Sequence, residues 1–236
     1  MSKIKVLIPT DFSMQSDFAG LMAKKLSGWL ELELHFIHII HLPSNITLAS
    51  DGTLHSDGEM DPRDFNRMKE MAEERLNGLK DQFPDVTTHI AYGGMKETVV
   101  KFAKKNHFDL ILMGTKGAFG LKEKLTGSET QHVVRTSDVP VLSVMCDRSD
   151  LEINNILLVH DFGAEEEQDL KLLKLILKAT GARLHLLYVS KSEKETAVEQ
   201  MKQNMESFIH DFGYENAEIH IIKDHNIVHG ITHFNQ

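Results

Sequence analysis

Gly114, Gly117, Gly127 and Ser128 have the residue types and the spacing of an anion-binding loop. Two residues separate the first two glycines, nine residues lead to the third, and Ser128 follows at once. Glycine lets a backbone approach a ligand closely and adopt positive φ. Ser128 stands where a helix should begin, and a helix start offers free N–H groups and a positive dipole to phosphate. The pattern is neither the Walker loop nor the dinucleotide fingerprint. Taken alone, it is also compatible with an ordinary strand–loop–helix turn.

The flanking elements are expected to hold this loop at one edge of a parallel sheet. Leu110–Met113 and Val139–Val144 are short apolar runs of the kind that form buried parallel strands. A third run, Ile4–Pro9, is followed by Asp11 at the carboxyl end of the predicted strand, where open α/β sheets place their ligands. The alternative role for Asp11 is a helix cap. Lys116 and two further lysines, Lys122 and Lys124, lie on the glycine loop itself.

The rest of the first 148 residues alternates between strands and helices. Strands are expected at Glu33–Ile40 and Val86–Ala91, with a long polar loop from Leu42 to Asp61 and a helix opened by Pro62. This alternation predicts an α/β fold with an open, parallel, doubly wound sheet. The helix after Pro62 should bury one stripe of side chains, namely Phe65, Met68, Ala72, Leu76, Leu79 and Phe83.

The glycine motif resembles that of the nucleotide-binding members of the universal stress protein family. The likeness extends to Ile8–Ser13 at the first strand and to Pro140–Val144 at the last. It implies the strand order 3-2-1-4-5 and binding of ATP, with ADP or AMP as alternatives and Mg²⁺ as a possible companion. Phosphates would lie on the loop, and adenosine near Asp11 and the backbone of Ile39 and Met113. The implied cofactor-binding set is Pro9, Thr10, Asp11, Ile39, Met113, Gly114, Gly117, Gly127, Ser128 and Glu129.

Glu129 departs from the family pattern, which often has a small apolar residue after Gly-Ser. A carboxylate at a helix start competes with phosphate unless a divalent ion bridges the two. Three hypotheses follow: an ATP-binding stress-response or signalling protein, an adaptor that binds no nucleotide, and a slow ATPase. No catalytic motif stands out, so at most weak hydrolysis is expected. The protein partner that would respond to binding is unknown.

Composition narrows the possible partners. The chain has 236 residues, a net charge of −9 and one cysteine, Cys146. The net negative charge argues against general nucleic-acid or anionic-membrane binding, and a single cysteine suits a reducing cytoplasm.

Two groups of histidines are candidates for metal sites. His35, His38 and His41 do not predict one, because strand side chains alternate and the outer two lie ~20 Å apart. His225, His229 and His233 share a helix face, which is more simply an exposed polar surface. We therefore expect no metal.

From residue 151 the pattern restarts as an incomplete second copy. Asn155–Asp161 aligns with Lys5–Asp11, and Arg183–Val189 with Glu33–Ile39, both at an offset of 150 residues. We therefore expect a complete domain at 1–148 and a truncated one at 151–236, a tandem repeat whose second copy lacks the glycine loop and the last two strands. The strand Ile153–Val159 would then be an open edge. Because the second copy cannot cover Val139–Val144, a homodimer through that edge strand is expected.

Overall fold

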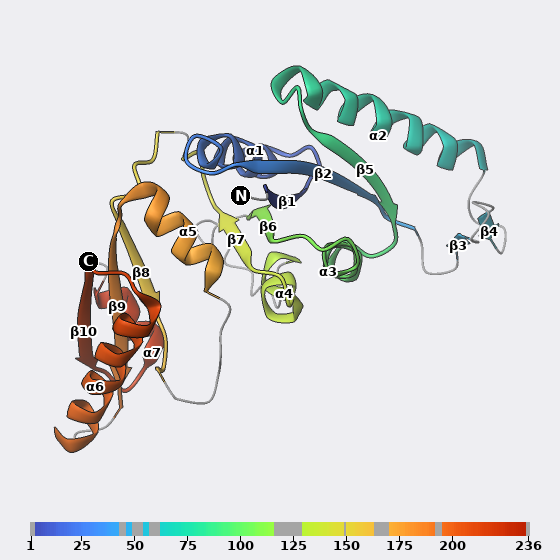
Figure 1. Cartoon of the computed structure of the whole chain (residues 1–236). Helices are drawn as coiled ribbons and strands as arrows, with labels where there is room; N and C mark the ends of the chain where they lie inside the picture. The colour runs from blue at the N-terminus through green and yellow to red at the C-terminus, as the bar shows by residue number, and fades with distance from the viewer. Residues whose placement is uncertain are drawn as a thin grey trace. The chain divides into compact units, whose positions relative to one another are not determined.

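The computed structural model divides the chain into two compact units, Met1–Asp150 (unit 1) and Leu151–Gln236 (unit 2). Each unit contains a parallel sheet with its own helices (Figure 1). Within the described ranges, no helix combines the length and the apolar character needed to cross a bilayer. The structure describes residues 3–42, 46–48, 54–56, 62–115, 129–148, 150–162, 170–191 and 195–234.

Unit 1 confirms the doubly wound parallel sheet and its predicted strand order. The sheet runs β5-β2-β1-β6-β7, with every neighbouring pair parallel. Counted without the short hairpin formed by β3 (Ile46–Leu48) and β4 (Leu54–Ser56), this is the order 3-2-1-4-5. The strands are β1 (Ile4–Pro9), β2 (Leu32–Ile40), β5 (Thr87–Tyr92), β6 (Leu110–Gly114) and β7 (Val141–Val144).

Helices cover both faces of this sheet. On one face, α1 (Met14–Leu26) and α2 (Pro62–Gln82) pack over alternate strand residues such as Ile8 and Phe36. On the other face, α3 (Met95–Lys105) and α4 (Glu129–Thr136) pack over a second set that includes Leu7, Ile37 and Ile111. Figure 1 shows the two pairs on opposite sides of the sheet. Central strands buried on both faces explain the almost wholly apolar runs in the sequence.

Two expectations about unit 1 are wrong in detail. The segment Leu42–Asp61 is not loop throughout, because β3 (Ile46–Leu48) and β4 (Leu54–Ser56) pair as an antiparallel hairpin. Each strand has only three residues, too few for alternation to stand out from the polar segment around it. In α2, Met68 is 39 % exposed, although Phe65 and Leu76 are buried as predicted. Met68 lies roughly 60° around the helix from Phe65 and so falls at the margin of the buried stripe.

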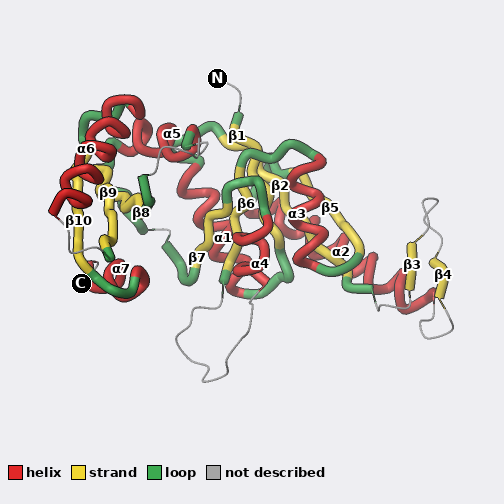
Figure 2. Tube along the Cα trace, turned by 90° about the horizontal axis from the view of Figure 1, so that it is seen from below, coloured by secondary structure: helices red, strands yellow, loops and turns green. Residues whose placement is uncertain are grey.

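Unit 2 contains a three-stranded parallel sheet in the order β10-β9-β8, which leaves β8 at an edge. Figure 2 shows these strands beside one another with the helices alongside. The helices and strands of unit 2 are β8 (Asn155–Val159), α5 (Lys171–Thr180), β9 (Arg183–Ser190), α6 (Glu195–Phe212), β10 (Ala217–Lys223) and α7 (Ile227–Phe234).

The order of β10, β9 and β8 repeats that of β5, β2 and β1 in unit 1. The turn after the first strand recurs as well. Phe12 and Phe162, 150 residues apart, have positive φ values of 61° and 49°. In both turns the phenylalanine N–H donates to a side chain two residues earlier, Thr10 Oγ1 in unit 1 and His160 Nδ1 in unit 2. The two turns therefore share a backbone conformation that phenylalanine rarely adopts.

Candidate functional site

A cavity of about 360 Å³ opens at the carboxyl edge of the sheet in unit 1. It lies where β1 and β6 are neighbours although they are not consecutive in the chain. At such a point the connections leave the sheet in opposite directions, which creates a crevice for ligands. Seven of the ten predicted site residues line it: Pro9, Thr10, Asp11, Ile39, Met113, Gly114 and Glu129. The other three, Gly117, Gly127 and Ser128, lie outside the described residues, as do the loop lysines.

The turn after β1 forms one wall of the cavity. Thr10 is buried, and its hydroxyl donates to Ser16 Oγ at 3.1 Å while accepting from the Phe12 N–H at 3.0 Å. Ser16 Oγ in turn donates to the Ser13 carbonyl at 2.8 Å. Ser13 caps α1 by accepting from the Ser16 N–H. This chain of bonds holds Phe12 at its unusual positive φ and fixes the direction in which Asp11 leaves the strand.

Asp11 does not cap α1, because Ser13 is the N-cap residue, but its carboxylate stabilises the turn that leads into the helix. Its Oδ1 accepts the Ser13 N–H at 3.0 Å, which stabilises the turn, and the residue also lines the cavity. Partial burial pushes the pKa of Asp11 upward, but hydrogen bonds from Ser13 and Ser16 together outweigh it and hold the pKa below its usual value. The carboxylate is therefore ionised at neutral pH and can accept hydrogen bonds from a ligand hydroxyl or bind a cation.

His38, near the end of β2, lines the cavity and packs against the tilted ring of Phe12. Its Nδ1–H donates to the Thr10 carbonyl at 2.8 Å, which leaves Nε2 as the acceptor in the neutral ring. The Phe12 ring lies 4.6 Å from the His38 ring, and the Arg75 guanidinium lies 5.2 Å from the Phe12 ring centre. His38 thus links the ends of β1 and β2 and offers an aromatic face beside Ile39.

Gly114, the last residue of β6, is required by close packing. A Cβ atom at this position would lie 1.8 Å from the backbone oxygen of Gln15 in the first turn of α1. The next helix is tied to the same place, because the buried Thr130 hydroxyl donates to the Gly114 carbonyl at 3.4 Å. The glycine therefore lets the end of β6 and the start of α1 meet at the cavity wall.

Two helix starts, those of α1 and α4, contribute residues to the cavity, namely Gln15 with Ser16 and Glu129 with Thr130. Helix N-termini favour negative ligands. The described lining nevertheless includes two carboxylates, those of Asp11 and Glu129, and no lysine or arginine. The carboxylates suit the hydroxyl groups of a ligand, and the helix starts suit an anionic group. A cation bound with the ligand would balance the negative charges.

The sequence reasoning missed several lining residues that share one structural property. All but Ile37, which lies three residues before the end of β2, are at a strand end or a helix start on the same edge of the sheet as Asp11. A search of every such position after the sheet had been predicted would have found them. The missed residues are Ser13, Gln15, Ser16, Ile37, His38, Met95, Thr115 and Thr130.

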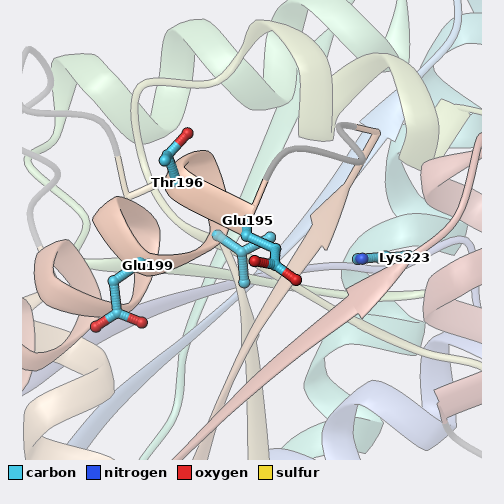
Figure 3. Close-up of a pocket in the computed structure, with 5 residues that line it drawn as sticks. Glu195, Thr196, Glu199 and Lys223 are labelled. Carbon is cyan, nitrogen blue, oxygen red and sulfur yellow. The ribbon is translucent and has the colours of Figure 1, made fainter.

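Unit 2 has a separate cavity of about 510 Å³, lined by Glu195, Thr196, Val198, Glu199 and Lys223. Figure 3 shows Glu195 and Lys223 extending toward the same space, whereas Glu199 points away from them. Two carboxylates accompany one ammonium group, and among the described lining residues Val198 is the only apolar one. This described lining therefore differs from the apolar walls with convergent polar groups that are typical of small-molecule sites.

Comparison with known proteins agrees with the resemblance seen in the glycine motif. The sequence model of the universal stress protein family matches residues 4–144. The universal stress protein MJ0577 of Methanocaldococcus jannaschii is 30% identical over 151 residues, which cover 59% of this chain and 93% of that protein. MJ0531 of the same organism is 31% identical over 144 residues, covering 59% of this chain and 81% of that protein.

A solved structure is similar over both units. The crystal structure of a universal stress protein from Archaeoglobus fulgidus has a TM-score of 0.67 at 23% sequence identity, and the alignment covers 95% of this chain and 80% of that one. At this identity the likeness concerns the fold alone. The family match spans more than half of the chain, including both walls of the cavity in unit 1. The chain therefore belongs to the universal stress protein family.

Proposed function

We propose that unit 1 binds an adenine nucleotide, with ATP as the leading candidate, in a cytoplasmic stress-response or signalling role. The observation that carries the proposal is the convergence of Asp11, Ile39, Met113, Gly114 and Glu129 on one cavity at the switch point of the sheet. They come from four separate stretches of the sequence, and all five belong to the set that the family resemblance implied. The Asp11 carboxylate would accept hydrogen bonds from the ribose hydroxyls. The backbone near Ile39 and Met113 would contact the adenine.

The phosphates would lie beyond Gly114, against the start of α4. Gly117, Gly127 and Ser128 would supply N–H groups and a hydroxyl there, as the family motif implies. Glu129 at the first position of α4 opposes a polyphosphate. We therefore propose that Mg²⁺ accompanies ATP and bridges the phosphates to carboxylate oxygens, the ligands that Mg²⁺ prefers. ADP or AMP would bind with less need for the metal ion.

A second candidate function is that of an adaptor that binds no nucleotide. The acidic lining favours it, because Asp11 and Glu129 face the cavity while no lysine or arginine belongs to the described part of the wall. In that case the same surface would recognise a protein partner. The two functions differ in one measurable property, which is saturable binding of ATP.

We also propose that unit 1 forms a homodimer through β7 and that unit 2 is a degenerate second copy of the same fold. β7 is an edge strand of its sheet, and Met145 just beyond it is 59% exposed. An edge strand presents backbone groups that can pair with another chain. The shared strand order and the recurring turn at Phe12 and Phe162 support the tandem repeat. Nucleotide binding would then alter the dimer or a surface that a protein partner reads.

Calorimetry on protein stripped of carried-over nucleotide tests the proposal. The wild type should bind one ATP per chain in the presence of Mg²⁺. Asp11→Ala should weaken binding by at least about tenfold, the equivalent of ~1.4 kcal/mol, because a hydrogen-bonded charged group is lost. Asp161→Ala, at the matching position of unit 2, is the control and should bind as the wild type does. No binding by folded wild-type protein would favour the adaptor function, and normal binding by Asp11→Ala would refute the assigned site.

A further inference from the structure

Two histidines and one glutamate in unit 2 converge within reach of a single metal ion. His185 lies on β9, and Glu218 and His220 lie on β10. One ligand atom from each of the three lies within 4.8 Å of the other two. His185 Nδ1 and His220 Nε2 are 3.0 Å apart, and Glu218 oxygens lie 3.7 Å and 4.0 Å from these two nitrogens. In a tetrahedral zinc site with bonds of about 2.0–2.1 Å, neighbouring ligand atoms are about 3.3 Å apart.

The strand register explains why these side chains meet. Glu218 pairs directly with His185 across the parallel ladder, and His220 is two residues further along β10, on the same face. The two imidazole rings lie 5.2 Å apart between centroids, and the Phe234 ring of α7 lies 4.7 Å from that of His220. The histidine side chains are each 20% exposed and that of Glu218 is 50% exposed. The ligands are thus held by the sheet but remain open to an ion from solvent.

A neighbouring residue places His185 in the tautomer that coordination needs. His185 Nε2 lies 3.0 Å from Asn155 Oδ1 on β8. Because that oxygen can only accept, Nε2 carries the hydrogen, and Nδ1 presents its lone pair toward His220 and Glu218. Such outer hydrogen bonds orient metal-ligating histidines in known sites. In the metal-free form His220 Nε2–H donates to His185 Nδ1. To bind an ion, His220 would change tautomer: its hydrogen would move from Nε2 to Nδ1, and the freed Nε2 would coordinate the ion. No proton is gained or lost in this change.

Unit 1 contains the same histidine pair without the third ligand. His35 Nδ1 lies 2.9 Å from His89 Nε2, and these residues occupy the equivalent positions on β2 and β5. Thr87 pairs with His35 in the register, as Glu218 pairs with His185. The only carboxylate bonded to the unit 1 pair in the described structure is that of Glu33, at 2.7 Å from His35 Nε2, on the far side of that ring. A carboxylate facing the gap between the rings is therefore particular to unit 2.

We propose that His185, Glu218 and His220 form a binding site for a Zn²⁺-type divalent transition-metal ion. Two imidazoles and one carboxylate suit zinc and leave a fourth position for water. The ion would join β9 to β10, and to β8 through Asn155, within the small sheet of unit 2. Glu218 also lies 3.5 Å from Arg183 Nη1 and would exchange that exposed ion pair for the metal.

The test is a Zn²⁺ titration of the chelator-stripped full chain, followed by calorimetry and by the ring ¹⁵N signals of histidine. The wild type should bind one Zn²⁺ ion per chain tightly, with the His185 and His220 signals shifting. Glu218→Gln keeps the shape of an exposed side chain while removing the anionic ligand, and it should weaken binding at least tenfold. His220→Gln should do the same.

Two controls separate this site from the other histidine groups. His89→Gln disrupts the pair in unit 1, and His229→Gln removes the exposed ring on α7 that lies 2.6 Å from Asp224. Both should bind Zn²⁺ as the wild type does. The proposal is overturned if the wild type binds no Zn²⁺, if Glu218→Gln binds it with unchanged affinity, or if either control variant loses the tight site.

Discussion

Replacing Gly114 with alanine tests how the cavity wall in unit 1 is built. The added Cβ would lie 1.8 Å from the Gln15 carbonyl oxygen, far inside the 3.0 Å below which real Cβ contacts are essentially never seen. The obstacle is backbone in the first turn of α1, so no side-chain rotation can relieve it. Either α1 or the end of β6 must move. Overpacking in a well-packed core costs about 1–3 kcal/mol, and we expect the upper end of that range for Gly114→Ala.

Gly78→Ala is the matched control for this substitution. Gly78 lies within α2, and a Cβ there would meet no atom within 4 Å. Alanine at an unobstructed helical position is more favourable than glycine by about 0.5–1 kcal/mol. The two variants therefore make the same chemical change with opposite expected signs. Alanine makes the unfolded chain less flexible than glycine does, which stabilises the folded state of both variants. The contact with Gln15 is therefore what should reverse the sign in Gly114→Ala.

Urea unfolding followed by tryptophan fluorescence measures both variants. Trp29, the only tryptophan in the chain, lies in unit 1 just after α1, so the signal reports the unit in question. The free energy of unfolding should fall by about 3 kcal/mol in Gly114→Ala, and the melting temperature by roughly 6–12 °C. It should rise slightly in Gly78→Ala. A Gly114→Ala variant as stable as the wild type, with Gly78→Ala behaving as expected, would refute the close-packing argument.

Three further predictions concern single side chains in unit 1. Thr10→Val keeps the shape of a buried side chain but leaves the Phe12 N–H without its acceptor, so unfolding should become about 1–3 kcal/mol easier in the same urea assay. Burial, with the nearby charges of His35 and Lys5, lowers the pKa of His89 below 6.5 in the folded state. The unfolded chain therefore takes up this proton first, and stability should fall as pH drops through about 6.5 and level off below the folded pKa. His89→Gln should make this loss shallower, and an unchanged pH profile would contradict the assignment. Glu129→Gln removes a carboxylate from the start of α4, so ATP should bind several-fold more tightly without Mg²⁺ and should gain less from added Mg²⁺ than it does in the wild type; calorimetry showing weaker binding without Mg²⁺ would contradict this.

Much of the fold follows from local pattern. The apolar runs at Ile4–Pro9 and Leu110–Met113 identify strands that are buried on both faces, and the alternation with helices leads to a parallel sheet. Asp11 was found because it follows closely on such a strand. His38 was not recognised as part of the cavity, because its role depends on the adjacent end of β1, where the Thr10 carbonyl accepts its hydrogen.

Other features depend on contacts that no single stretch of sequence reveals. The positive φ of Phe12 is maintained by a hydrogen-bond chain through Thr10 and Ser16, whereas phenylalanine itself disfavours that conformation. The histidine pairs across neighbouring strands were missed for the same reason. His185 and His220 are 35 residues apart, and only the register of β9 with β10 brings them together.

Methionine methyl NMR tests the central claim, that ATP binds at the switch point of unit 1, most directly. Met95 and Met113 line the cavity, whereas Met205 is fully buried in the core of unit 2. With the methionine methyl groups labelled and assigned by substitution, adding ATP and Mg²⁺ should shift the Met95 and Met113 signals and leave that of Met205 in place. Saturating ATP that leaves Met95 and Met113 unshifted would contradict the account, whether or not signals from unit 2 move.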